Sequence, residues 1–234
     1  FPVGPVKVYA ALESSGLTLV DCGPNTPEAR EALEAGLAAL GHSIRDVRRI
    51  LVSHAHADHY GLAACLAAES GAQVYTHPFN RPMLEAYQGE RDQRLAFYNS
   101  LLITFGAPGD VIELIHHARQ RVGEYASPVQ IAGDLNDGDQ VILAGREWQV
   151  LHTPGHSGGL VCLHDPHSHI LLSNDHLLRD ISSNPLVEPP PPGRSKRRRS
   201  LVEDTEQIQR VAALGISVAW PGHGEPIDGV IELV

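Results

Sequence analysis

The stretch His54-Ala55-His56-Ala57-Asp58-His59 places four metal-ligating side chains within six positions. It follows Ile50-Leu51-Val52 almost directly, and an apolar run of this kind is typical of a buried strand. A strand that ends there leaves the next residues in a loop that opens a helix, so the ligating side chains can converge from a tight turn. Because the two alanines are small and Gly61 tolerates a bend, we expect this turn to pack closely.

Three further ligand-type residues also follow predicted strands. His156 and His223 share the local sequence Pro-Gly-His, and Asp175 follows the apolar run Ile170-Leu171-Leu172. In Pro-Gly-His, proline fixes the direction of the chain and glycine permits an unusual dihedral angle, so the imidazole can turn inward at a strand end. Four strand ends that each present ligands predict a cluster at one rim of a sandwich.

Together these stretches supply five imidazoles and two carboxylates, a set that suits two divalent ions sharing an oxygen. Histidine and carboxylate without thiolate favour zinc, with iron or manganese as alternatives. We interpret Cys22 as a small buried residue, and we expect Asp21, which follows a predicted strand, to hydrogen-bond to a ligand. Two ions about 3.5–4 Å apart activate water and stabilise a hydrolytic transition state. The sequence therefore predicts a binuclear metallohydrolase.

The composition favours one globular domain over residues 1–234. Hydrophobic residues make up 42% of the chain, enough for a sizeable core, and the formal net charge of −10 argues against general nucleic-acid binding. Three scattered cysteines imply no disulfide framework. The sequence shows no signal peptide and no apolar run long enough to span a membrane, so we expect a cytoplasmic protein that acts on a small molecule.

The first eighty residues alternate predicted strands and helices. Val6–Ala10 and Leu17–Val20 are expected to be strands joined by a turn, and a helix follows with Thr26 as its cap and Gly41 just past its end. A helix is also expected over 61–69 and a strand over 72–75. This rhythm predicts a sheet covered by helices on one face.

From about residue 81 to 126 the pattern is helical only, which predicts an insertion between two strand-rich halves. Strand signals return at 141–143, 148–151, 160–163, 170–172 and 217–220. Residues 188–200 are rich in proline and arginine, and we expect an exposed, mobile loop there. Ser200 and Glu203 are spaced as a capping box for the last helix.

The His-x-His-x-Asp-His core, followed in order by His156, Asp175 and His223, resembles the metallo-β-lactamase superfamily of the binuclear, glyoxalase II-like kind. The resemblance runs from about residue 6 to 227. It implies an α/β (α+β) fold, an αββα sandwich of two mixed β-sheets flanked by helices, with the metals at one edge between the sheets. Glyoxalase II carries a C-terminal helical substrate domain, and we expect the insertion at 81–126 to supply the helices here instead.

The resemblance also implies roles for the ligands. His54, His56 and His156 should hold the first metal, and Asp58, His59 and His223 the second; Asp175 should bridge the two beside a bridging hydroxide. Asp21 matches an early Asp-x-Gly motif of the family. Asn174 stands where glycine often precedes the bridging aspartate, and we expect it to tilt the carboxylate. Class B β-lactamases have arginine where His59 stands or a cysteine near the Asp175 position, so antibiotic hydrolysis is not expected.

The expected reaction is cleavage of an ester-like bond by the metal-bridging hydroxide, with an acyl thioester of a small thiol placed first. Asp58 is expected to act through the second metal, and Asp175 to keep the metals together and relay a proton. The alternatives are a lactone or simple ester, a phosphodiester bound through Arg194–Arg199, and a diiron oxidoreductase. The insertion is expected to cover the metals or to form a homodimer surface.

Overall fold

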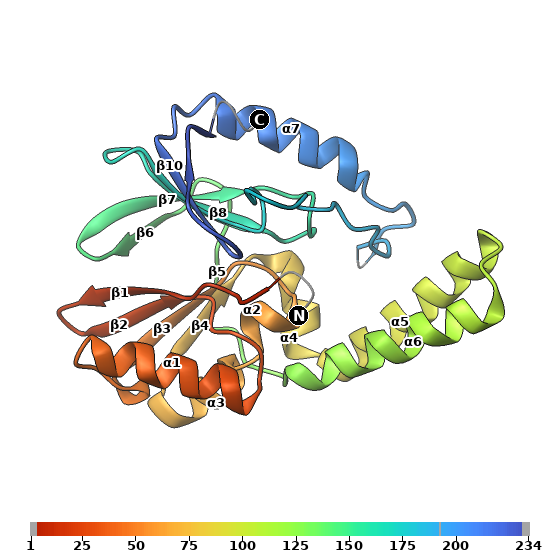
Figure 1. Ribbon diagram of the computed structural model, residues 1–234, viewed down its shortest axis with the longest axis horizontal. Helices are drawn as coiled ribbons and strands as arrows, with labels where there is room; N and C mark the ends of the chain where they lie inside the picture. Colours follow the sequence, from red (N-terminus) through yellow and green to blue (C-terminus); the bar gives the residue numbers. More distant parts are fainter. Residues whose placement is uncertain (1–3, 192, 231–234) are drawn as a thin grey trace.

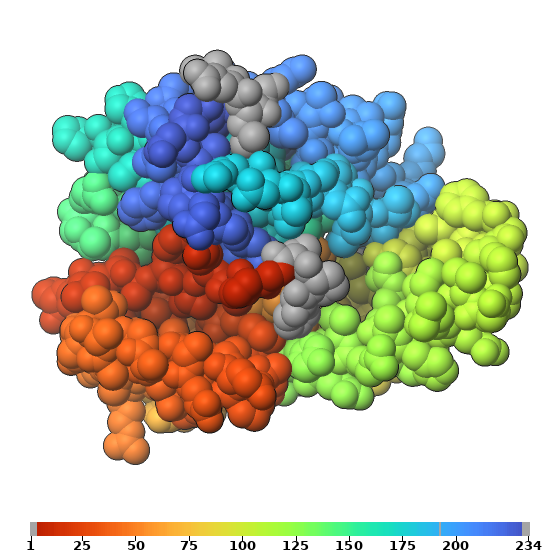
Figure 2. Space-filling view, viewed as in Figure 1, coloured from red at the N-terminus to blue at the C-terminus, as the bar shows by residue number. Residues whose placement is uncertain are grey.

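Two mixed β-sheets lie face to face, with helices on their outer sides, in the computed structural model, which describes residues 4–191 and 193–230 (Figure 1). This is the predicted αββα sandwich. Helices α1 and α3 cover the first sheet, and α7 covers the second. The hairpin made by α5 and α6 projects from the side of the sandwich, as Figure 2 also shows.

The first sheet contains one antiparallel pair, β1 with β2, and parallel pairs beyond it. Glu13 pairs with Gly16, so only two residues form the turn between β1 and β2. The strand order is that of the sequence, and the strands are β1 Tyr9–Glu13, β2 Gly16–Val20, β3 Val47–Val52, β4 Gln73–Thr76 and β5 Gly133–Asp134.

The second sheet has the order β11-β10-β9-β8-β7-β6, and only β9 and β10 are parallel within it. That parallel pair matters because the ligands after β9 and β10 then emerge from the same edge. The strands are β6 Gln140–Leu143, β7 Arg146–His152, β8 Val161–Asp165, β9 Ile170–Asn174, β10 Val218–Pro221 and β11 Ile227–Asp228.

Helix α1 begins and ends where local signals in the sequence place it. Thr26 caps α1 by accepting a hydrogen bond from the Ala29 amide at 3.2 Å, and Gly41 beyond its end has a φ of +78°. The α-helices are α1 Pro27–Ala39, α2 Ala57–Tyr60, α3 Ala63–Ser70, α4 Arg81–Glu85, α5 Tyr87–Thr104, α6 Gly109–Val122 and α7 Ser200–Ala212; short 3₁₀ helices are η1 Ile44–Asp46, η2 Pro78–Asn80 and η3 Gly123–Tyr125.

Three apolar layers hold the sandwich together, and single strands contribute to two of them. In β3, Ile50 packs toward the helices on the first sheet, whereas its neighbour Leu51 packs between the sheets. In β9, Leu172 lies between the sheets and Leu171 packs toward α7. This follows from the period of two along a strand. Because both faces of each sheet are covered, the strand ends are held rigidly relative to one another.

Two local predictions were wrong. The first strand begins at Tyr9 rather than Val6, because Val6 instead makes an isolated antiparallel bridge with His223. The capping box at α7 does not form: Ser200 is already helical, and Glu203 accepts a hydrogen bond from the Arg198 guanidinium at 2.9 Å. Within the described part of the chain, no helix has the length and apolarity needed to cross a bilayer.

Helix α7 is fixed beside the second sheet by an unusual close contact. A Cβ atom on Gly155 would lie 2.3 Å from the Oδ1 atom of Asp204, so only glycine allows this approach. Asp204 is 5% exposed, and its Oδ1 has no hydrogen-bond partner among the described residues. Burial raises the pKa of the Asp204 carboxyl to about 6.

The raised pKa of Asp204 makes folding stability depend on pH. The folded state favours the protonated Asp204 carboxyl. The contribution of this group to the free energy of unfolding is therefore most favourable below about pH 4, and it is lost as the pH rises through 6. We expect Asp204→Asn to raise the free energy of unfolding at pH 8 by about 1 kcal/mol and to leave it nearly unchanged at pH 4. Urea unfolding at the two pH values measures this, with Glu206→Gln, on an exposed residue of α7, as the control. Equal shifts at both pH values would contradict it.

Candidate metal centre

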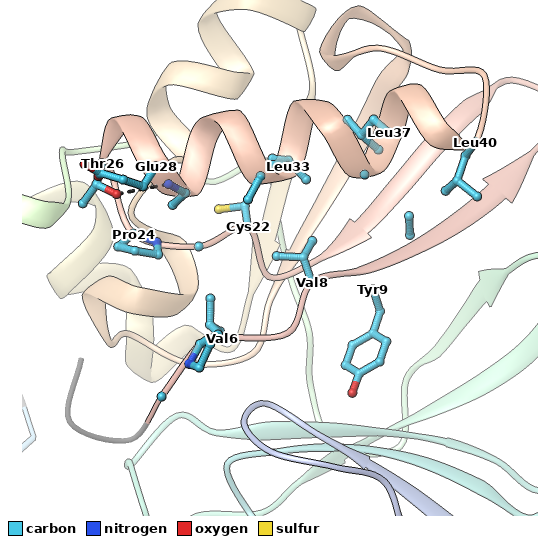
Figure 3. Close-up of a pocket in the computed structure, with 17 residues that line it drawn as sticks. Val6, Val8, Tyr9, Cys22, Pro24, Thr26, Glu28, Leu33, Leu37 and Leu40 are labelled. Carbon is cyan, nitrogen blue, oxygen red and sulfur yellow. Dashed lines mark hydrogen bonds between the residues drawn. The ribbon is translucent and has the colours of Figure 1, made fainter.

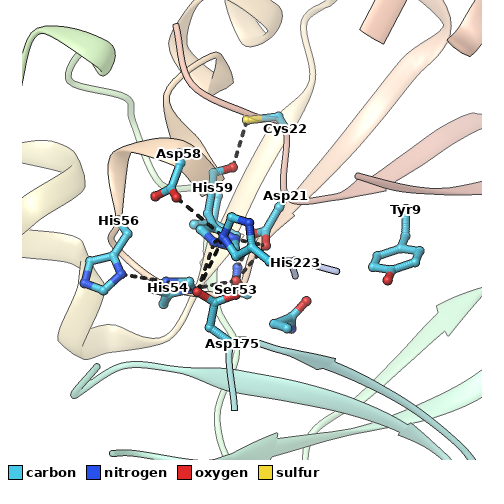
Figure 4. A network of polar contacts seen from close by, with 12 residues as sticks. Tyr9, Asp21, Cys22, Ser53, His54, His56, Asp58, His59, Asp175 and His223 are labelled. Atoms are coloured by element: carbon cyan, nitrogen blue, oxygen red, sulfur yellow. Dashed lines mark hydrogen bonds and ion pairs between the residues drawn. The ribbon is translucent and has the colours of Figure 1, made fainter. Parts of the chain in front are cut away.

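Seven histidine and aspartate side chains from both sheets meet at one edge of the sandwich. Figure 4 labels all of them except His156. Their donor atoms form three overlapping groups, each with all atoms within 4.8 Å of one another. All seven follow the ends of strands. His54 and His56 lie in the loop after β3, and Asp58 and His59 lie in α2, which comes directly after that loop; His156 follows β7, Asp175 follows β9, and His223 follows β10. The structure therefore brings together every ligand that the sequence predicts.

Close backbone packing, rather than an unusual dihedral angle, accounts for the glycines of these loops. Gly155 and Gly222 have no positive φ, so the expected dihedral role in Pro-Gly-His is wrong. A Cβ atom on Gly222 would lie 2.2 Å from Asp175 Oδ1, and one on Gly61 would lie 2.1 Å from the Tyr125 carbonyl. Gly61 has an ordinary helical φ of −52°, so it provides space rather than a bend.

Four of the five imidazoles use Nδ1 to donate a hydrogen bond away from the cluster. His156 donates to the Ser183 carbonyl and His223 to the Pro5 carbonyl. His59 donates to the Asp21 carboxylate at 2.7 Å. These contacts fix the rings so that each Nε2 atom faces the other ligands.

His54 follows the same rule through a hydroxyl group. The Ser53 hydroxyl donates to Asp21 Oδ2 at 2.7 Å, so it accepts from His54 Nδ1 at 2.9 Å. His56 is the exception, since its Nδ1 atom faces the cluster.

The nitrogen atoms of the first group are already at ligand spacing. His56 Nδ1 lies 2.9 Å from His54 Nε2 and 3.0 Å from His156 Nε2. In the second group, His223 Nε2 lies 3.3 Å from His59 Nε2 and 3.5 Å from Asp58 Oδ2. Each set of three atoms converges from different directions on one region.

Asp175 lies between the two groups. Its Oδ2 atom is 3.4 Å from the Nε2 atoms of both His59 and His156, and 3.9 Å and 3.7 Å from those of His54 and His223. Its Oδ1 atom is buried without a hydrogen-bond partner among the described residues. Asn174, just before it, adopts a φ of +47°, which asparagine tolerates better than most residues, and its amide donates to the Val161 carbonyl at 2.8 Å.

The surroundings favour neutral imidazoles at His54 and His56, a charged imidazole at His59, and ionised carboxylates. Burial lowers the pKa of His54 well below its usual range and lowers that of His56 to about 3. For Asp58, burial acts to raise the pKa, but the hydrogen bond with His223 and the nearby imidazoles outweigh it, and the pKa falls to about 2. Burial also acts to lower the pKa of His59, but Asp175 and Asp21 raise it well above its usual range.

This donor set fits cations. The Nδ1 hydrogens of His59 and His223 point away, so the two Nε2 atoms face each other at 3.3 Å and need a positive charge between them. The raised pKa of His59 has the same origin, because Asp175 and Asp21 favour a positive charge at this position. Nitrogen and carboxylate donors without a thiolate are suited to divalent metal ions.

Asp21 and Cys22 adopt different roles at the end of β2. Asp21 has a φ of +58° and accepts hydrogen bonds from the Ser53 amide, the Ser53 hydroxyl and His59. Cys22 is buried, and its thiol donates to the His59 carbonyl at 3.4 Å, away from the cluster. Ser53 was not among the predicted residues, although a polar residue between a buried strand and His54 was a usable signal. The Pro5 and Ser183 carbonyls carried no such signal.

One sizeable cavity touches the seven clustered residues. A groove of about 490 Å³ is lined by His56 and Asp58. A larger hollow of about 800 Å³ lies between α1 and the N-terminal segment, where Val6, Leu33 and Leu40 line it (Figure 3). None of the seven clustered residues lines that larger hollow.

Comparisons with known proteins agree with this geometry. The family model described as Metallo-beta-lactamase superfamily matches residues 2–223. The probable metallo-hydrolase YqjP of Bacillus subtilis is 34% identical over 235 residues, covering 100% of this chain and 72% of that protein. A crystal structure of a metallo-beta-lactamase family protein from Thermus thermophilus is 30% identical with a TM-score of 0.83, covering 100% of this chain and 73% of that one.

One further similarity is local. The acyl-coenzyme A thioesterase MBLAC2 of Homo sapiens is 51% identical over 41 residues, which cover 18% of this chain and 15% of that protein. The family match spans nearly the whole chain, and the seven ligand-type residues lie together at the sheet edge. The chain therefore belongs to the metallo-beta-lactamase superfamily.

Proposed function

We propose that the seven clustered residues hold two divalent metal ions. His54, His56 and His156 would hold one ion, and Asp58, His59 and His223 would hold the other; Asp175, which lies between the two groups, would contribute to both. The central position of the Asp175 Oδ2 atom, 3.4 Å from one histidine of each group, is the observation that carries the assignment. Zinc suits this nitrogen and oxygen set, and iron and manganese remain alternatives.

The chain acts as a hydrolase of an ester-like bond, with an acyl thioester as the first candidate substrate. Two bound divalent ions would supply a hydroxide nucleophile near neutral pH and positive charge for the developing oxyanion. Asp58 and Asp175 are ionised at that pH, and both are positioned to hold a proton at a carboxylate oxygen during the reaction. The thioester assignment is supported by the local similarity to MBLAC2.

Asp21 acts as a positioning residue. Because it accepts from His59 Nδ1 and from Ser53, which in turn accepts from His54, it orients one ligand of each metal. The same contacts tie the ends of β2 and β3 together beneath the cluster.

A second candidate activity is cleavage of a phosphodiester. The observation that favours it is a run of exposed cations in the loop before α7, formed by Arg194, Lys196, Arg197 and Arg199. None of the four forms an ion pair with a carboxylate in the part of the chain that the structure describes. The same metal ions would serve either reaction, so the two candidates differ only in the substrate.

The thioester assignment predicts metal-dependent turnover of an acyl-glutathione or acyl-coenzyme A thioester. The zinc-loaded protein should hydrolyse it well above background, and Asp58→Asn should lower kcat/KM by at least about 100-fold, since it removes a charged ligand. Release of the free thiol, followed with a thiol reagent, measures the rate. With two ions shown to be bound, no turnover of either thioester would reject the assignment and favour lactones or phosphodiesters.

The close contact at Gly222 predicts a specific loss of metal. A methyl group there would lie 2.2 Å from Asp175 Oδ1 and 2.9 Å from His59 Cε1, so both ligands must move. We expect Gly222→Ala to lower the zinc content from two ions per chain to one or fewer, measured by elemental analysis of the purified protein. Gly36→Ala is the matched control, because a Cβ atom on this α1 glycine meets no atom within 4 Å. Two ions retained in Gly222→Ala would contradict the assignment.

The positioning role of Asp21 predicts weaker metal binding without loss of a ligand. In Asp21→Asn, the amide cannot reproduce the three accepted hydrogen bonds, and we expect zinc affinity to fall roughly 10- to 100-fold. Competition with a chromogenic chelator measures the affinity. Glu147→Gln, on an exposed residue of β7, serves as the control. An affinity in Asp21→Asn equal to that of the control would show that Asp21 does not orient His59.

A further inference from the structure

The groove of about 490 Å³ connects the ligand cluster to the α5–α6 hairpin. His56 and Asp58 line it together with residues of both helices, so it is continuous with the candidate metal centre. Its volume lies within the range of small-molecule sites, roughly 300–1,000 Å³. A substrate whose scissile bond lies at the ligands would therefore extend into this groove.

The walls of the groove are mainly apolar. No residue of α6 is buried, so the sandwich does not cover the apolar side of this helix. Part of that side faces the groove instead, opposite apolar residues of α4, α5 and the loop after β9. The apolar lining side chains are Met83, Leu95, Tyr98, Ile115, Val122 and Leu186.

Polar contacts made by Arg94, Glu188 and Arg91 hold these walls in place. The Arg94 guanidinium lies 3.2 Å from Glu188 Oε1, and Glu188 Oε2 accepts from the Gly158 amide at 2.8 Å. Gly158 is two residues beyond His156, so the hairpin is fixed relative to the metal ligands. The Arg91 side chain also donates to the Gln120 carbonyl at 2.9 Å, which joins α5 to α6. A wall that is already in place needs little ordering when a ligand binds.

The arginines of the groove lie against aromatic rings, so their aliphatic stems add to the apolar walls. The guanidinium carbon of Arg119 lies 3.6 Å from the centre of the Tyr98 ring, and that of Arg91 lies 5.4 Å from the centre of the Tyr87 ring. Neither arginine forms an ion pair with a carboxylate among the described residues. A groove with such walls suits a hydrocarbon chain.

We propose that this groove binds the aliphatic chain of a fatty acyl group, so that the preferred substrates are esters or thioesters of medium-chain fatty acids. The chain lies along Leu95, Ile115 and Val122, and the acyl carbon lies beside His56 and Asp58. The inference rests on the proposed hydrolysis for its reaction, but binding of the chain depends on the groove alone.

Binding of the product carboxylate tests the chain site without turnover. Titration calorimetry of the zinc-loaded full chain should show decanoate binding at least tenfold more tightly than acetate, since each methylene that leaves water adds roughly two- to fourfold in affinity. Ala118→Trp, on a residue lining the groove, should remove most of this preference, and Leu95→Asn should weaken it. Glu113→Trp, on an exposed residue of α6 outside the groove, should keep it. Equal affinities of the unmodified chain for decanoate and acetate would overturn the proposal.

Turnover distinguishes failure of the groove from failure of the proposed function. With acetyl, butanoyl, octanoyl and decanoyl thioesters, kcat/KM should rise with chain length in the unmodified chain and in Glu113→Trp, and should rise little in Ala118→Trp. Decanoate binding that Ala118→Trp removes, without turnover of any thioester, would reject thioester hydrolysis and support the groove. Turnover that is independent of chain length would support hydrolysis and overturn the groove.

Discussion

The carboxylate of Asp175 is the group on which the rest of the site depends. One of its oxygens lies within 4 Å of four imidazole nitrogens that come from both sheets. A single buried negative charge facing so many lone pairs is unfavourable unless positive charge lies among them. The same atom that joins the two sheets therefore also favours positive charge at the centre of the cluster. Apolar packing on both faces of each sheet makes this convergence stable, because it holds the strand ends in place.

Two non-glycine residues beside the cluster adopt an uncommon backbone conformation. Asp21 and Asn174 are both in the left-handed region, at φ +58° and +47°, and both end strands that lead into the cluster. Aspartate and asparagine tolerate this region better than most residues. Here their side chains also hydrogen-bond to neighbouring strands: Asp21 accepts from the Ser53 amide, and Asn174 donates to the Val161 carbonyl. Asn174 can therefore adopt the left-handed backbone conformation that a glycine would adopt at this position. The expected tilt of the carboxylate does not displace it from the centre of the cluster.

Residue type and spacing were enough to predict that the seven residues converge, and the resemblance to the superfamily implied the αββα sandwich. Histidines and aspartates that directly follow apolar strands are typical of metal ligands, and strands that share an edge bring their ends together. Contacts made by backbone atoms were not predictable: any residue can offer the carbonyl that Pro5 and Ser183 provide to His223 and His156. The sequence also does not show which partner a side chain will choose. Glu203 accepts a hydrogen bond from Arg198 instead of forming the capping box with Ser200.

The chain separates the groups that would perform chemistry from those that would select a substrate. The seven clustered residues follow the ends of rigid strands, whereas half of the residues that line the groove belong to α5 and α6, which contribute few buried residues to the body. A change in the hairpin can therefore alter the groove while leaving Asp175 and its neighbours in place. Loops and insertions on a rigid scaffold commonly carry specificity for this reason. Glu188 is the exception to this separation. It pairs with Arg94 of the hairpin and accepts a hydrogen bond from the backbone close to His156, and so it couples the groove to the cluster.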